Sequence, residues 1–137
     1  MTPVVIWFAF HKATPLRQAW RERRWSFLGH VDCWGATQEG IWFWFNPEAV
    51  GTTLDLTTDP VGIDYHFAER IAARCSILQF RPKARQIGLP FHPTMNCASQ
   101  CGHLVGLRAY TPWGLRRMLL ANGATEWNDN AGCEREP

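Results

Sequence analysis

The chain has 137 residues, a formal net charge of +2 at pH 7, and a hydrophobic content of 46%. A chain of this length and apolar content folds as one domain around one core and needs no disulfide bonds to do so. The net charge is too small to imply a polyanionic partner by itself, and the sequence contains no recognised nucleic-acid-binding motif, so we expect no specific nucleic-acid partner.

The first predicted element is a strand over the apolar run Val4–Phe10, which is rich in β-branched and aromatic residues. This run is too short to cross a bilayer, and it lacks the basic region and cleavage site of a secretory signal. The five cysteines are an odd number scattered along the chain, which favours reduced thiols over a disulfide scaffold. We therefore expect a cytoplasmic protein without a membrane span.

Two strands and a helix are predicted next. Thr14-Pro15 is typical of a helix start, and the amphipathic pattern that follows predicts about three turns. Residues 25–34 and 41–45 predict two strands joined by a turn over 35–40. Asn46-Pro47 should end the second of these strands, because proline cannot donate to a central ladder. The following residues up to 63 are expected to form a loop or a short helix.

The C-terminal half predicts three helices and one strand. Asp64 is the expected N-cap of a helix to about Arg74, and 76–80 predicts a strand. A helix is expected from Thr94 or Asn96 to about Leu107.

The last predicted helix starts at Thr111-Pro112 and ends at the C-cap pair Asn122-Gly123. The predicted domain therefore covers 1–123, and 124–137 is expected to be a polar tail that makes few contacts with it. If Trp127 is ordered, we expect it to pack on another subunit.

Cys97 is the first candidate for chemistry, because it lies at the predicted start of a helix. Unpaired backbone N–H groups and the helix dipole stabilise a thiolate there, and the same N–H groups can bind the oxyanion of a tetrahedral intermediate. The alternative is a buried cysteine that acts as a small apolar residue.

His30 is the candidate base, provided that its strand packs beside the helix of Cys97. Asn46, at the end of the neighbouring strand, can hold the imidazole in one tautomer, and Asp32 is the competing orienter. Because Asp32 is two residues along the strand, its side chain points the same way as that of His30 but about 6–7 Å further on. The alternatives are a structural histidine at 30 and a turn residue at 46.

The order of these elements resembles the circularly permuted, NlpC-like branch of the papain-like cysteine hydrolases. The likeness covers roughly residues 4–121 and depends on Phe27-Leu28-Gly29-His30-Val31 and on Asn96-Cys97-Ala98-Ser99. The segment CGHLVGLRAYTPWGLRRMLL is also similar to the ending of small phage-encoded proteins of this type.

The resemblance implies an α+β fold in which a small antiparallel sheet packs against helices, one of which carries the cysteine. It also implies a Cys97–His30 hydrolase that acts on peptide or peptidoglycan-like amides, with lipid acyl groups as a further substrate class. Asn46 departs from the pattern, because family members often have an acidic residue or histidine there. The alternative function is a non-catalytic virion or assembly protein that binds other virion subunits.

A metal site is the main rival interpretation of the cysteine-containing segment. His92, Cys97, Cys101 and His103 lie close together in the sequence. They include no C-x2-C knuckle, and on a helix His103 would point away from Cys97. We therefore expect neither a metal nor a cofactor.

Overall fold

The computed structural model describes residues 3–12, 28–48, 51–82 and 96–127. The described elements, in chain order, are β1 (Pro3–Lys12), β2 (Leu28–Thr37), β3 (Trp42–Glu48), β4 (Gly51–Thr57), α2 (Val61–Ala72), β5 (Ser76–Phe80), α3 (Cys97–Leu104), α4 (Pro112–Ala121) and β6 (Thr125–Glu126). The six strands form one antiparallel sheet in the order β4-β3-β2-β1-β5-β6. The protein is therefore of mixed α+β class, as predicted.

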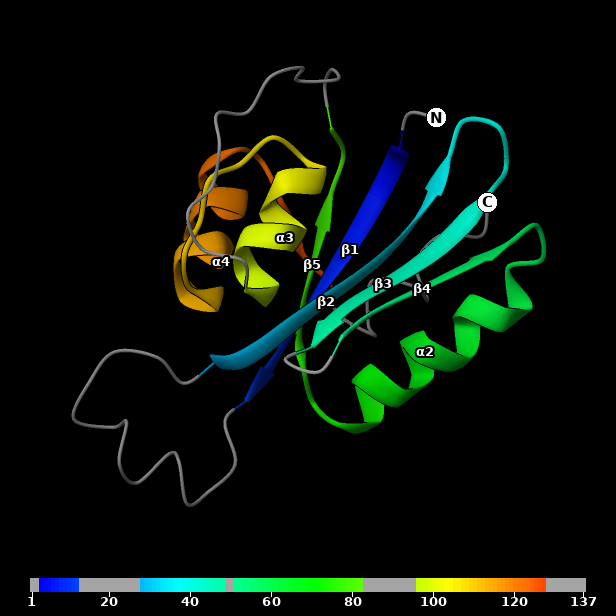
Figure 1. Ribbon diagram of the computed structural model, residues 1–137, viewed down its shortest axis with the longest axis horizontal. Helices are drawn as coiled ribbons and strands as arrows, with labels where there is room; N and C mark the ends of the chain where they lie inside the picture. The colour runs from blue at the N-terminus through cyan, green and yellow to red at the C-terminus, as the bar shows by residue number, and fades with distance from the viewer. Residues whose placement is uncertain (1–2, 13–27, 49–50, 83–95, 128–137) are drawn as a thin grey trace, which may run out of the picture.

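Helices cover both faces of the sheet, with α3 and α4 on one side and α2 on the other (Figure 1). Alternation along β1 divides its side chains between two cores, since successive strand residues point to opposite faces. Phe8 and Phe10 pack with Leu115 and Leu119 of α4, whereas Ala9 packs with Ile63 of α2. The central strands are thus buried on both faces.

Several sequence signals predict the observed boundaries well. The strand over 76–80 has the predicted ends. Thr111 caps α4 by accepting a hydrogen bond from the backbone N–H of Gly114 at 3.0 Å, with Pro112 as the first helical residue. Asn96 caps α3, and was one of the two predicted start positions. These signals are local, so tertiary contacts do not override them.

The prediction that Asn46-Pro47 ends the third strand is wrong. The strand β3 continues to Glu48, and Pro47 lies opposite Thr52 of β4. Pairing between β3 and β2 runs only from Trp42 to Phe45, so Pro47 lies beyond the β2 ladder and has a strand partner on one side. Proline is tolerated at such an edge-like position.

The loop predicted after Pro47 contains the strand β4, with the sequence GTTLDLT. This strand lies at one edge of the described sheet, and nearly all of its residues are exposed. Its polar composition reflects this exposure, and in the sequence it is indistinguishable from a loop.

The helix predicted from Asp64 begins earlier than expected. Pro60 occupies the N-cap position of α2, and the carboxylate of Asp59 accepts a hydrogen bond from the backbone N–H of Val61 at 3.0 Å. Asp64 lies instead in the first turn, where its charge complements the helix dipole. The strand predicted to end at residue 34 also continues, as β2, to Thr37.

The expectation that Trp127 packs on another subunit is wrong. Its ring meets the ring of Phe67 edge-to-face at 4.6 Å, and its backbone N–H donates to the carbonyl of Ile77 at 2.9 Å. Just before it, Glu126 pairs with Leu78 as part of β6. The domain therefore extends past residue 123. The predicted helix after Thr14, most of the 81–93 loop and the rest of the predicted tail lie outside the described residues.

Candidate active site

Cys97 is the first residue of α3, and a double cap fixes that helix start. The side chain of Asn96 accepts the backbone N–H of Ser99 at 2.8 Å, and the Ser99 hydroxyl oxygen accepts the backbone N–H of Asn96 at 2.9 Å. The Asn96 amide also donates to the carbonyl of Tyr110 at 2.7 Å. This network satisfies local donors and leaves the half-buried Cys97 thiol at the helix N-terminus, where an anion is stabilised.

The structure brings His30 and Cys97 together as hydrogen-bonding partners. The hydrogen bond with Cys97 raises the pKa of His30 above its ordinary value, against a lowering by burial and with support from Asn46. Burial alone would raise the pKa of Cys97, but His30 and two backbone groups outweigh it and lower that pKa. Opposite shifts in a cysteine and its histidine partner favour a thiolate–imidazolium pair.

The third predicted residue, Asn46, lies on the other side of the imidazole. Nε2 of His30 and Oδ1 of Asn46 are 2.7 Å apart, and Nδ2 of Asn46 donates to the Glu48 carboxylate at 2.9 Å. Because the Asn46 amide nitrogen is committed to Glu48, its oxygen must accept from Nε2–H of His30. This leaves Nδ1 of His30 as the nitrogen available to the Cys97 sulfur.

The strand geometry explains why these side chains can meet. The β2–β3 ladder ends where Cys33 lies opposite Phe45, so His30 and Asn46 lie beyond its last pair. The His30–Asn46 hydrogen bond therefore joins the two strands where the backbone ladder does not. The register of β1 against β2 also shifts next to His30, between His11 and Lys12. Such irregularities commonly re-aim side chains at functional sites.

Backbone groups complete the surroundings of the Cys97 sulfur. Hydrogen bonds from the backbones of Val31 and Ala98 lower the pKa of Cys97. A hydrogen bond that lowers a thiol pKa must be donated to the thiolate, so these donors are N–H groups. The arrangement supplies a nucleophile, a base held in one tautomer, and helix N–H groups suited to an oxyanion.

Asp32, the competing orienter, belongs to a separate network. Its fully buried carboxylate accepts hydrogen bonds from Nε2 of His11 at 2.7 Å and from Nε1 of Trp44 at 2.8 Å. Arg70 donates to it twice, at 2.9 and 2.6 Å. Asp32 acts on His30 only as a nearby negative charge that helps to raise its pKa. The orienting hydrogen bond to His30 thus comes from Asn46.

Two other described cysteines, Cys75 and Cys101, lie in surroundings that disfavour a thiolate. Burial raises the pKa of Cys75 to about 11, and its sulfur lies 3.5 Å from Nδ1 of His11. Cys101 is fully buried, and its hydrogen bond with Cys33 is the main cause that raises its pKa. The pKa of Cys97 is lowered, in contrast to those of Cys75 and Cys101.

The residues of the rival metal site are dispersed. Cys101 is buried and donates to the carbonyl of Val31 at 3.7 Å, His103 is exposed, and His92 lies outside the described residues. Within the described ranges, no three His, Cys, Asp or Glu side chains are grouped to hold a metal ion. No helix in the described part of the chain is long and apolar enough to cross a membrane.

Sequence reasoning missed Glu48, which orients Asn46. A strand that continues through Pro47 places residues 46 and 48 on the same face. This i, i+2 spacing could have indicated the contact, but the strand was expected to end before Glu48. Comparisons with protein-family models, with curated proteins and with solved structures found no match for this chain.

Proposed function

We propose that this protein is a cysteine-dependent hydrolase with a permuted papain-like fold, acting on a carbonyl of an amide or ester. The observation that supports this most directly is the continuous chain of side-chain hydrogen bonds Cys97–His30–Asn46. The order of elements fits as well, since the histidine strand precedes the cysteine helix. The substrates that the sequence resemblance implies are peptides of the peptidoglycan type, and the site of action is the cytoplasm or a phage particle.

In the proposed reaction the Cys97 thiolate attacks the carbonyl carbon, and helix N–H groups stabilise the oxyanion that forms. As the bond to the leaving nitrogen or oxygen breaks, the imidazolium of His30 gives that atom its proton, and a thioester remains on Cys97. Water then attacks the thioester while His30 takes up the proton of the water. The carboxylic acid product then leaves Cys97, which regenerates the thiolate–imidazolium pair.

The experiment that tests this function compares the purified protein with its Cys97→Ala variant on peptidoglycan fragments, peptide anilides and simple esters. We expect hydrolysis by the wild type and none by the variant, with an acyl group on Cys97 detected by mass spectrometry. Cys75→Ala is the matched control and should retain activity, since that thiol lies beside His11 and burial raises its pKa to about 11. Absence of both turnover and an acyl adduct would favour the non-catalytic assembly protein.

A further inference from the structure

A second histidine, His11, lies beside the base of the site. In the β1–β2 ladder His11 lies directly opposite His30, and side chains at such paired positions project from the same face of the sheet. The centroids of the two imidazole rings are 5.3 Å apart, and the ring planes are tilted by 50°. This separation is within the range at which aromatic rings pack on one another. The ring of His11 is therefore a further contact of His30, besides Cys97 and Asn46.

The His11 ring is anchored to the buried interior of the domain. Its Nε2 donates to the carboxylate of Asp32 at 2.7 Å, and Asp32 is fully buried. Asp32 lies two residues from His30 on the same strand and is therefore a diagonal neighbour of His11 across the ladder. The other ring nitrogen, Nδ1, lies 3.5 Å from the sulfur of Cys75, and a thiol is only a weak hydrogen-bond partner. The bond to the Asp32 carboxylate thus fixes where the His11 ring lies.

The base of the site needs such a support, because one hydrogen bond does not fix the plane of an imidazole. The bond between Nε2 of His30 and Oδ1 of Asn46 holds one ring atom, at 2.7 Å, and the ring can still turn about that point. Rotation about the last side-chain bond of a histidine has a broad energy minimum. Proton transfer nevertheless requires that Nδ1 of His30 points at the Cys97 sulfur. A ring that packs against His30 restricts this rotation.

We propose that His11 is a positioning residue of this site, whose ring holds the imidazole of His30 in the orientation in which Nδ1 meets the Cys97 sulfur. This inference rests on the Cys97–His30 pair of the proposed function. A restricted imidazole favours the hydrogen bond with Cys97, and that bond is the main cause that raises the pKa of His30. Loss of the His11 ring should therefore lower the thiolate fraction of Cys97 near neutral pH.

The charged and titratable groups around the two imidazoles come from β2, β3, α2 and the residue before β5: Asp32, Glu48, Arg70 and Cys75. His11 binds Oδ1 of Asp32, whereas both hydrogen bonds from Arg70 go to Oδ2. A substitution of His11 therefore leaves the ion pair between Asp32 and Arg70 in place. The pH profile of such a variant reports on His30 and Cys97 rather than on the loss of that ion pair.

The test is the rate at which iodoacetamide alkylates Cys97, followed by mass spectrometry between about pH 5 and pH 9. His11→Gln keeps a donor for Asp32 but removes the flat ring. We expect it to label about 2- to 10-fold slower than the wild type at about pH 6–7, the effect of losing one pair of packed aromatic rings. The pH of the half-maximal rate should rise.

His11→Phe is the complementary variant, because it keeps a flat ring but has no donor for Asp32. It should label Cys97 faster than His11→Gln does, although the lost hydrogen bond lowers its urea midpoint more. A merely structural role predicts the reverse order, in which the less stable variant is also the slower one to label.

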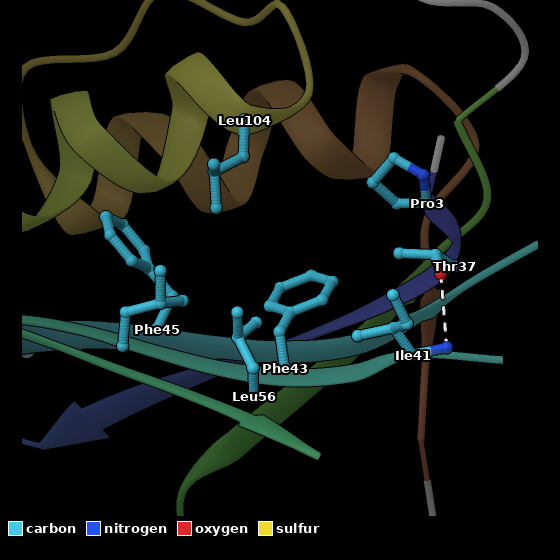
Figure 2. A pocket seen from close by; sticks show the side chains of 8 residues that line it. Pro3, Thr37, Ile41, Phe43, Phe45, Leu56 and Leu104 are labelled. Atoms are coloured by element: carbon cyan, nitrogen blue, oxygen red, sulfur yellow. Dashed lines mark hydrogen bonds between the residues drawn. The ribbon is translucent and has the colours of Figure 1, made fainter. Parts of the chain in front are cut away.

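Two variants control for indirect effects on the sheet. Trp44→Phe removes another donor to Asp32, at 2.8 Å, and the ring at this position stacks on His66. Leu56→Ala changes a side chain in the apolar hollow that Figure 2 shows between the end of α3 and the strands β3 and β4. Both variants should keep the wild-type alkylation rate of Cys97 at every pH.

The possible outcomes separate this inference from the function on which it rests. Equal rates for the wild type and His11→Gln at every pH, together with slow labelling of His30→Ala, would overturn the inference and leave the proposed function standing. An equal loss in Trp44→Phe, or slower labelling of His11→Phe than of His11→Gln, would also overturn it, because the effect would then come from the hydrogen bond to Asp32. If His30→Ala labels as fast as the wild type, the inference and the proposed function both fail.

Discussion

Replacement of Asp32 by alanine should destabilise the protein strongly. Asp32 is fully buried, and its carboxylate accepts four hydrogen bonds, one from His11, one from Trp44 and two from Arg70. Asp32→Ala leaves the largely buried Arg70 guanidinium and two further donors without this acceptor. Removing one partner of a buried ion pair costs about 3–5 kcal/mol. Native proteins have roughly 5–15 kcal/mol of stability in total, so the variant should still fold but should lose a substantial part of its stability.

Urea unfolding measures this loss. We expect the urea concentration at the midpoint to fall by roughly 2 M, given the usual slope of the unfolding free energy against urea concentration. Asp55→Asn is the matched control, since the carboxylate of Asp55 is 57% exposed and its ion pair with His66 at 3.7 Å should contribute under about 1 kcal/mol. A loss below 1 kcal/mol in Asp32→Ala would refute the reasoning.

The stability due to Asp32 should also depend on pH. Burial would raise the pKa of Asp32, but hydrogen bonds from His11 and Arg70 outweigh it and lower that pKa below its ordinary value. Because the pKa is lower in the folded state, the stabilisation is complete at pH values above the pKa of the unfolded state, which is roughly 4. The stabilisation is lost as the pH falls through the pKa of the folded state. The difference in unfolding free energy between wild type and Asp32→Ala should therefore shrink in acid, and a constant difference would contradict the assignment.

Four further predictions concern single positions. Asn46→Ala removes the hydrogen bond that helps to raise the pKa of His30, so kcat/KM should fall about 10- to 100-fold, and the alkaline limb of the pH–rate profile should move to lower pH. Gly102→Ala places a Cβ 2.6 Å from a backbone carbonyl oxygen and should cost about 1–3 kcal/mol in urea unfolding. Gly62→Ala, whose Cβ meets nothing closer than 3.9 Å, should instead stabilise by about 0.5 kcal/mol. At pH 8, Cys75 should alkylate more than about 100-fold slower than an exposed thiol, because its pKa is about 11.

The elements with local signals were predictable from the sequence. The apolar run of β1, the cap of α3 at Asn96 and the Thr111-Pro112 start of α4 each depend on a few neighbouring residues. The placement of Cys97 at a helix start followed from the same kind of signal. Their physical causes act within one or two turns, so a single sequence contains them.

The parts that failed depend on partners distant in the sequence. Whether Pro47 ends a strand depends on whether β2 still pairs there, and the sequence around Pro47 does not record this. The choice between Asn46 and Asp32 likewise depended on Arg70, which comes from α2 and binds Asp32. Trp127 was assigned to a partner because no periodic pattern surrounds it, although its ring fits against Phe67.

The central claim is that His30 activates Cys97, and alkylation of Cys97 by iodoacetamide tests it most directly. Rates are measured by mass spectrometry at several pH values for the wild type and for His30→Ala. Burial alone raises the pKa of Cys97, so loss of the histidine should leave the thiol largely protonated near neutral pH. A hydrogen bond to a charged group is worth about 1.5–3 kcal/mol, which corresponds to labelling about 10- to 100-fold slower at pH 6–7. Identical rates for the two proteins at every pH would contradict the claim.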